Sequence, residues 1–401
     1  MVPNGWEEKT LEDITKEKIS YGIVQAGPHI DDGVPYLKSS DVGGEISISS
    51  LQRTAHDIHE KYKRSAVHPN DIVFSLRGNI GRTSIVPGNL PEANLTQGTA
   101  RISVNDKNDT KFVYYSLATS WTLNRINSLS KGSTFKEISL AELRKVKLLF
   151  PSLPEQQKIA KILTTWDKAI DATERLIDNS KQQKKALMQQ LLTGKKRVLD
   201  DKGQRFEGEW DWLRASEIFK PISKKNNSAN EELLSVTQDR GVLPRSILER
   251  RVVMPDGSTK GYKLVEKGNF IISLRSFQGG LEYSYFRGLV SPAYTVLEPI
   301  VEINDEFYKH YYKSYDFIGH LAVAVIGIRD GKQISYTDFS FLRLPYPPLK
   351  EQQKIAAVLT NADKEVELLE QQLADLQQEK KALMQVLLTG KKRVQIDGRV
   401  V

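Results

Sequence analysis

This chain contains no cysteine and no apolar run long enough to cross a bilayer. Without cysteine, disulfides, thiol catalysis and thiolate metal sites are excluded, and a reducing compartment is compatible. The longest apolar stretch, residues 318–328, is too short to span a membrane, and residues 1–12 are polar and acidic, unlike a secretion signal. We therefore expect a soluble cytoplasmic protein with no membrane partner.

The chain also lacks any strong local excess of charge in its globular parts. The net charge is +8, but residues 1–154 carry 19 basic against 17 acidic side chains, and residues 199–350 carry 21 against 20. The excess is concentrated in residues 155–198, with ten basic against five acidic side chains. Charge alone thus gives mild support for binding a polyanion.

Catalytic motifs are missing as well. Gly194-Lys195-Lys196 lacks the upstream glycine and the hydroxyl of a phosphate-binding loop, and no Gly-x-Ser-x-Gly sequence is present. A nuclease-like site could combine Asp256 with Asp330 and Lys332, but both stretches contain Asp-Gly, which is typical of turns. No metal site is predicted, and the motifs identify no enzyme.

The chain does contain a long internal repeat. Residues 155–198 return as residues 351–394 at a constant offset of 196, without insertion, and 26 of the 44 positions are identical. A repeat at about half the chain length predicts a molecule built as two copies of one plan. We therefore expect a pseudo-twofold relation between the halves.

Both copies of the repeat have the pattern of a long helix. Apolar residues recur at alternating steps of four and three, as in a helix that packs along another helix, and about 40 residues would give roughly 60 Å. Gly194 and Gly390 predict the helix ends. Lys184 and Lys380 fall on the apolar pattern, and we expect their stems to pack there and help to fix the register. The predicted helix-pair interface comprises Ile159, Leu163, Trp166, Ile170, Ile177, Leu187, Leu191, Ile355, Leu359, Val366, Leu369, Leu373, Leu376, Leu383 and Leu387.

A globular part that mixes short β-rich runs with helical stretches precedes each long helix, so the fold class is α+β. Residues 71–77 predict a turn, a buried strand and an exposed arginine, and residues 269–275 repeat that design. The predicted organisation is a first globular domain, a central helix, a second globular domain, a C-terminal helix and a tail. Their bounds are 1–154, 155–198, 199–350, 351–394 and 395–401.

Polar loops recur in the two globular parts and predict a nucleic-acid surface. Residues 77–82 combine two arginines and an asparagine with two glycines, and arginine and asparagine match guanine and adenine edges. Other loops add hydroxyls, amides and lysines that suit phosphates. The candidate DNA-binding residues are Arg77, Asn79, Arg82, Gln97, Thr99, Lys131, Ser133, Lys136, Arg275, Gln278, Tyr294, Arg329, Lys332 and Gln333.

These features together resemble the DNA specificity subunits of type I restriction-modification systems. The resemblance covers nearly the whole chain and is carried by the paired Glu-Gln-Gln-Lys-Ile-Ala openings, the Lys-Lys-Ala-Leu-Met-Gln segments and the Leu-Leu-Thr-Gly-Lys-Lys-Arg ends. Leu153-Pro154 precedes the first opening, whereas Leu349-Lys350 precedes the second and departs from the family pattern at the proline.

The resemblance implies a non-catalytic subunit whose two target-recognition domains each read one half of a split double-stranded DNA site. It implies that the long helices form an antiparallel coiled coil that sets the spacer length and docks two modification subunits, and that two restriction subunits complete the assembly. S-adenosylmethionine would belong to the modification subunit, and ATP and magnesium to the restriction subunit, leaving no cofactor in this chain. The alternatives are a coiled-coil scaffold and a DNA-processing protein with its own nuclease activity.

Overall fold

The computed structural model describes residues 2–23, 25–132, 136–225, 227, 231–238, 240–248, 259–274, 276–324, 334–396 and 399–400. The chain forms two compact units. Unit 1 comprises residues 1–173 and 372–401, and unit 2 comprises residues 174–371. Each unit therefore combines one globular part with the start of one long helix and the end of the other.

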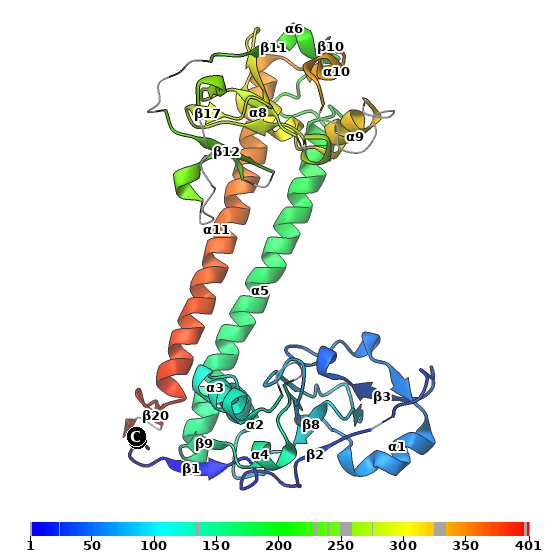
Figure 1. The fold of residues 1–401 in the computed structure, drawn as a ribbon, viewed down its shortest axis with the longest axis vertical. Coiled ribbons are helices and arrows are strands. Elements are labelled where there is room, and N and C mark those ends of the chain that lie inside the picture. Colours follow the sequence, from blue (N-terminus) through cyan, green and yellow to red (C-terminus); the bar gives the residue numbers. More distant parts are fainter. Residues whose placement is uncertain are drawn as a thin grey trace. The chain divides into compact units, whose positions relative to one another are not determined.

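The two predicted long helices are present. They are α5 (Leu153–Leu191) and α11 (Leu349–Leu387), of 39 residues each (Figure 1). Gly194 and Gly390 follow with φ of +70° and +67°, a left-handed conformation that glycine adopts readily and that ends a helix. Every predicted interface residue is buried or half-buried, whereas the intervening positions are largely exposed. The heptad positions are thus the more buried positions of each helix, and their contact with the other helix stays a prediction.

Within each unit the two helix segments run antiparallel. In unit 1, Glu155 pairs with Arg393 and Asp167 pairs with Lys380. Residues further along α5 therefore contact residues that come earlier in the α11 segment, as in an antiparallel pair. In unit 2, Glu351 pairs with Arg197 and Asp363 with Lys184, in the same sense. The antiparallel arrangement that the family resemblance implied is confirmed.

Within its described residues, the globular part of unit 1 contains three small sheets. The central one has four antiparallel strands in the order β2-β8-β5-β6. Its strands are β2 (Ser20–Tyr21), β8 (Thr99–Ile102), β5 (Ile72–Ser75) and β6 (Thr83–Ile85). A second sheet joins β4 (Arg53–Thr54), β3 (Val34–Leu37) and β7 (Asn94–Leu95), and an antiparallel pair joins β1 (Glu7–Thr10) to β9 (Lys147–Phe150). The helices are α1 (His56–Tyr62), α2 (Thr110–Leu117), α3 (Ser120–Leu129) and α4 (Leu140–Arg144), and β20 (Gln395–Ile396) pairs with β21 (Arg399–Val400).

Unit 2 repeats this central topology. Its four-stranded sheet has the order β11-β18-β15-β16, and a strand pair again joins the start of the globular part to its end. The strands are β10 (Asp211–Arg214), β11 (Phe219–Ile222), β12 (Leu234–Thr237), β13 (Gly241–Pro244), β14 (Lys263–Val265), β15 (Phe270–Ile272), β16 (Glu282–Tyr283), β17 (Gly288–Val290), β18 (Thr295–Pro299) and β19 (Arg343–Tyr346). The helices are α6 (Ala215–Ile218), α7 (Ser276–Gly279), α8 (Asp305–Tyr311), α9 (Tyr315–Ala324) and α10 (Tyr336–Ser340).

Helix caps show the repeat residue by residue. Asp109 caps α2 by accepting from the Phe112 amide, and Asn304 caps α8 by accepting from the Phe307 amide. Ser139 and Ser335, at the offset of 196, cap α4 and α10 in the same way. An N-cap hydrogen bond stabilises a helix by about 1 kcal/mol, so these short polar side chains are explained by local structure.

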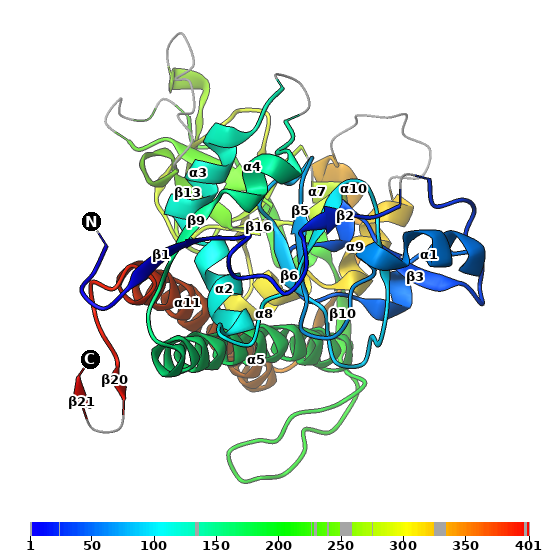
Figure 2. The same cartoon turned by 90° about the horizontal axis from the view of Figure 1, so that it is seen from below.

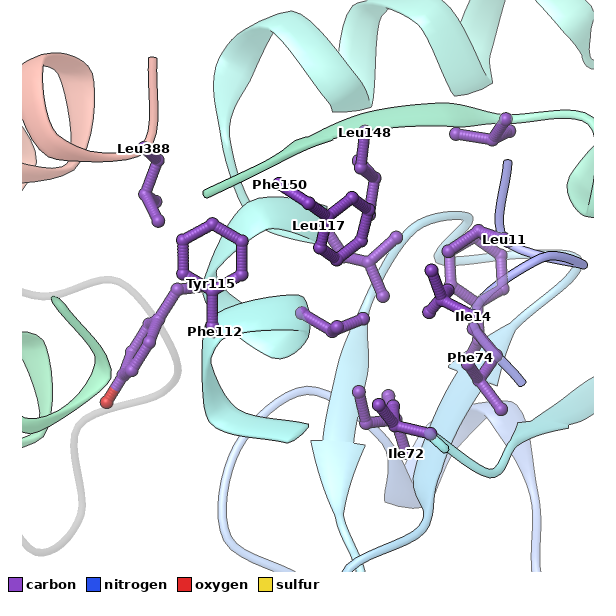
Figure 3. Close-up of a cluster of buried hydrophobic side chains, with 14 of the residues drawn as sticks. Leu11, Ile14, Ile72, Phe74, Phe112, Tyr115, Leu117, Leu148, Phe150 and Leu388 are labelled. Atoms are coloured by element: carbon purple, nitrogen blue, oxygen red, sulfur yellow. The ribbon is translucent and has the colours of Figure 1, made fainter. Parts of the chain in front are cut away.

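Each unit has its own main core, which includes both helix segments. In unit 1, Ile159 and Leu163 of α5 and Leu388 just beyond α11 pack with the globular side chains drawn in Figure 3, among them Phe112 and Phe150. In unit 2, the counterparts Ile355, Leu359 and Leu192 pack in the same way around Phe219, Phe270 and Tyr312. Burying a large apolar side chain contributes about 1.5–3 kcal/mol, so each globular part is held to the helix segments by its core.

Candidate nucleic-acid interface

The turn between β5 and β6 presents the arginine-rich loop of unit 1. Arg77, Asn79 and Arg82 are exposed there, directly after the buried strand β5. Gly78 and Gly81 have φ of +73° and +84°, so the tight turn depends on residues that adopt the left-handed region. The structure thus presents all three predicted polar side chains of this loop to solvent.

Arg77 lies next to Gln97 in space, although 20 positions separate them in the sequence. Its Nη2 donates to Oε1 of Gln97 at 3.3 Å. Gly98 lies beneath this pair, where an added Cβ would stand 3.1 Å from Nε of Arg77 and 2.8 Å from Oγ of Ser39. Ser39 donates to the Gly98 carbonyl at 2.8 Å and so belongs to the same cluster.

The segment that contains the predicted residues Lys131 and Lys136 lies at the same place. The Ile138 amide donates to the Leu76 carbonyl at 3.0 Å, and Glu137 forms isolated bridges with Arg77 and with Lys131. Lys131 and Lys136 are both exposed. Three segments that the sequence separates by up to 60 positions therefore form one polar surface, whose cationic side chains are suited to a phosphate backbone.

One residue proposed for this surface was assigned wrongly. Thr99 is fully buried, and its hydroxyl donates to the carbonyls of Leu37 and Thr96 at 3.2 and 3.1 Å. These hydrogen bonds hold the backbone at the start of β8, and the buried side chain is not accessible to a ligand. Ser39 was missed because it sits after β3 in a segment without any motif, and only the fold brings it to Gly98.

The corresponding surface of unit 2 is described only in part. Gln278 is exposed on α7, and Tyr294 is half-buried and packs against a small core below. The Tyr294 carbonyl accepts from Nζ of Lys263 at 2.6 Å, and burial lowers the pKa of that lysine. The predicted residues Ser133, Arg275, Arg329, Lys332 and Gln333 lie outside the described residues, as do Asp256 and Asp330 of the nuclease alternative.

The long helices carry a second set of polar groups. The guanidinium of Arg393 donates twice to the buried Glu155 carboxylate, at 2.7 Å each. Arg197 binds the buried Glu351 in the same way, at 2.6 Å each. In each unit, the arginine of the Lys-Lys-Arg cluster that follows one long helix thus binds a glutamate at the start of the other long helix. The neighbouring lysines are exposed.

Lys184 and Lys380, the two lysines that fall on the apolar pattern of the long helices, also have defined partners. Lys380 pairs with Asp167, which further accepts from the Tyr115 hydroxyl, where α2 lies beside α5 (Figure 2). Lys184 pairs with Asp363, whose carboxylate lies 3.7 Å from Nδ1 of His310. Both lysine side chains are half-buried, as expected, and the ammonium group of each forms an ion pair with an aspartate.

Tyr115 and His310 occupy equivalent places in the two units. The Tyr115 hydroxyl lies 3.2 Å from Oγ1 of Thr164, and Nε2 of His310 lies 3.3 Å from Oγ1 of Thr360. Burial raises the pKa of Tyr115, and burial lowers the pKa of His310 to about 4 even though Asp363 acts in the opposite direction. Both side chains are therefore uncharged at neutral pH.

The described residues contain no group of three histidine, aspartate or glutamate side chains that could hold a metal ion. None of the described helices has the length and apolar character that crossing a membrane requires. The candidate site comprises the exposed polar loops of each globular part and the ion-paired polar groups of the long helices. Exposed arginine, asparagine and lysine side chains on such loops are typical of a nucleic-acid-binding protein.

Comparison with known proteins agrees with this class. The family model for the type I restriction modification DNA specificity domain matches residues 3–181 and again residues 207–378. This chain therefore belongs to the type I restriction-modification DNA specificity family, with two copies of the domain. The two matches correspond to the two halves of the internal repeat.

Individual relatives extend over the chain. A protein of Methanocaldococcus jannaschii assigned as the specificity subunit of type I restriction enzyme MjaX is 26% identical, over 98% of this chain and 95% of its own length. The EcoBI specificity subunit of Escherichia coli is 29% identical over 48% of this chain and 41% of its own length. The crystal structure of a type I S subunit from M. genitalium shares the fold, with a TM-score of 0.58 at 16% identity over 97% of this chain and 98% of that one.

Proposed function

We propose that this chain is the non-catalytic DNA-recognition subunit of a type I restriction-modification enzyme. Each globular domain would read one half of a bipartite site in the major groove. The observation that carries the proposal is the double family match on one repeated scaffold, β2-β8-β5-β6 and β11-β18-β15-β16, with unlike residues in the loops. Two similar supports with different surface loops suit the reading of two different half-sites.

The chemistry of the unit 1 loop supports direct base contact. The Arg77 guanidinium keeps free donors beyond the one that binds Gln97, and paired arginine donors match O6 and N7 of guanine. The Gln97 carbonyl is engaged, so its amide NH2 remains available to a base acceptor. Lys131 and Lys136 flank this pair and would contact phosphates, which position the protein without specifying sequence.

We further propose two modification and two restriction subunits as partners, acting in the cytoplasm. S-adenosylmethionine would be bound by the modification subunits, and ATP and magnesium by the restriction subunits. The pseudo-twofold repeat supports two similar partners on one asymmetric chain. The antiparallel helix segments would set the separation of the half-sites.

The test is methylation mapping in cells that express this chain with the modification subunit of its own system. Methylated adenines should define a split motif with a fixed unspecified spacer. Arg77→Ala should relax one base pair in one half-site only, at a cost of about 1–3 kcal/mol. Arg125→Ala removes an exposed arginine on α3 and serves as the matched control. Uniform weakening on all sequences would reassign Arg77 to phosphate contact.

The two alternatives give different results in solution. Mg²⁺-dependent cleavage of DNA by the purified chain alone would support a DNA-processing protein with its own nuclease. Absence of any methylation motif, with intact binding of protein partners, would support a coiled-coil scaffold.

A further inference from the structure

Gln52 of unit 1 is held by its neighbours through its side-chain carbonyl, as Gln97 is. It is exposed and lies directly before β4. Its Oε1 accepts from the Tyr36 hydroxyl at 2.7 Å and from Nζ of Lys38 at 3.1 Å. The backbone amide of Tyr36 also donates to the backbone carbonyl of Gln52, at 2.9 Å, so β3 and this segment are joined. Gln52, Tyr36 and Lys38 were not among the candidates predicted from the sequence.

These partners fix which end of the Gln52 amide faces solvent. An ammonium group only donates hydrogen bonds, so the Gln52 atom that faces Lys38 must be the carbonyl oxygen. That oxygen has two lone pairs, and Lys38 and Tyr36 occupy both. Burial, together with the Asp41 carboxylate, raises the pKa of Tyr36, so its hydroxyl stays protonated and donates. The NH2 group of Gln52 binds no acceptor among the described residues, and it is the polar end that a ligand meets.

Lys38 connects Gln52 to the polar surface around Arg77. It directly precedes Ser39, whose hydroxyl donates to the Gly98 carbonyl at 2.8 Å. Gly98 packs beneath Arg77, because an added Cβ there would stand 3.1 Å from Nε of that arginine. The cluster around Gln52 and the cluster around Arg77 are therefore neighbours on one surface.

The same segment also contacts the other arginine of the loop. The side chain of Arg82 lies across Gly43, where an added Cβ would stand 2.8 Å from its Cδ. The Gly43 amide donates to Oγ of Ser84 at 3.0 Å, which holds the segment against β6. Residues 38–44 therefore lie along the loop formed by residues 77–82, and a duplex that contacts the loop meets this segment as well.

An amide fixed in this way is restricted in the bases that it can read. Glutamine reads adenine with both ends of its amide, because the carbonyl accepts from N6 while the NH2 group donates to N7. The Gln52 carbonyl is already saturated, so this mode of contact is closed. The remaining NH2 group only donates, which suits O6 of guanine or O4 of thymine and opposes the amino groups of adenine and cytosine. Gln97, whose carbonyl accepts from Arg77, offers the same end of its amide.

We propose that Gln52 is a specificity-determining residue of unit 1, and that it selects a guanine or thymine on the contacted strand at one position of the half-site. Tyr36 and Lys38 are positioning residues, because they act through the orientation of the Gln52 amide. This inference rests on the proposed function, and it adds the kind of base that unit 1 requires at a residue outside the predicted loops.

The experiment maps methylated sequences in cells that express the full chain with the modification subunit of its own system. Gln52→Glu has nearly the same shape and keeps one oxygen towards Lys38, but it replaces the outward NH2 donor by an acceptor. The base required at one position should therefore change from guanine or thymine to adenine or cytosine on the same strand, with a change of about tenfold in the ratio of methylated sites. The changed position should lie in the half-site that Arg77→Ala alters.

A second variant tests the orientation of the amide itself. Lys38→Met with Tyr36→Phe frees the Gln52 carbonyl, so the same position should accept adenine as well, whereas a merely structural role of these two residues would leave the motif unchanged. Gln157→Glu is the matched control, because it makes the same chemical change at an exposed glutamine of α5 within unit 1 and should leave the motif as it is.

The outcomes separate this inference from the proposed function. Absence of any split motif with the wild-type chain contradicts both. A split motif that Gln52→Glu leaves unchanged, or one that the control alters at the same position, overturns only the role of Gln52. Circular dichroism melting checks that each variant is folded. A folded Gln52→Glu variant that methylates no site also overturns that role, because the reading of one base pair predicts an altered motif and not a general loss.

Discussion

The ion pair between Arg393 and Glu155 should contribute more to stability than its counterpart in unit 2. Glu155 is fully buried, and both of its oxygens accept from Arg393. Arg393→Ala would leave that carboxylate buried without a cation, which costs about 3–5 kcal/mol. The loss falls on unit 1, where the end of α11 is joined to the start of α5.

The counterpart substitution provides an internal comparison. Glu351 also accepts from Nε1 of Trp210 at 3.0 Å, whereas Nε1 of the equivalent Trp6 is buried without a partner among the described residues. Arg197→Ala therefore leaves Glu351 with one strong hydrogen bond, and hydrogen bonds to charged groups contribute about 1.5–3 kcal/mol. We expect Arg197→Ala to destabilise its unit by less than Arg393→Ala, by about that difference.

Hydrogen exchange measured by mass spectrometry distinguishes the two units, because peptides from the start of α5 report on unit 1 and peptides from the start of α11 report on unit 2. The double variant Glu155→Gln with Arg393→Ala removes the buried charge and should recover part of the loss. Equal protection losses in Arg393→Ala and Arg197→Ala, or a loss below about 0.5 kcal/mol in Arg393→Ala, would refute the reasoning.

Three further predictions concern the spacer, a buried histidine and a buried threonine. Inserting one heptad into each long helix adds about 10 Å and should lengthen the unspecified DNA spacer by about three base pairs in methylation mapping; an unchanged spacer would contradict the proposed role of the helices. Burial lowers the pKa of His310 to about 4, whereas an unfolded histidine has a pKa of about 6.5. The unfolded chain therefore binds this proton more readily as the pH falls below about 6.5, and the free energy of unfolding of the wild type should decrease by up to about 3 kcal/mol towards pH 4. His310→Tyr, which copies Tyr115, should not show that loss, and parallel melting-temperature curves from pH 7 to pH 4.5 would count against it. Thr99→Val removes hydrogen bonds to Leu37 and Thr96 and should lower stability by about 1–3 kcal/mol without altering the methylated sequence; an altered sequence would return Thr99 to the recognition surface.

The helices were predictable because their signal is local and repeated. Heptad spacing identified the buried side of α5 and α11, and the glycine positions identified where they end. The partners of individual polar groups were not predictable in this way. Arg197 and Arg393 look like solvated helix ends in the sequence, and only the antiparallel packing brings each to a buried glutamate about 150 or more positions away.

The recognition loops show the same limit. Residue type and glycine content indicated the exposed Arg77 loop, but the sequence could not distinguish the half-buried Gln97 from the fully buried Thr99, two positions further on. Both are polar, and the direction of each side chain is set by how β8 enters the sheet. The contact between Arg77 and Gln97 likewise depends on strand order, which hydrophobic spacing does not specify.

The division of the chain between the two units has a consequence for its synthesis on the ribosome. All segments of unit 2 have been made once residue 371 is translated, whereas unit 1 also needs residues 372–401, which are made later. Until then, Ile159 and Leu163 lack Leu387 and Leu388, which pack in the same core in the folded protein. The domain translated first is therefore the one completed last, and a nascent chain stalled before residue 372 would present an unfinished apolar face to chaperones.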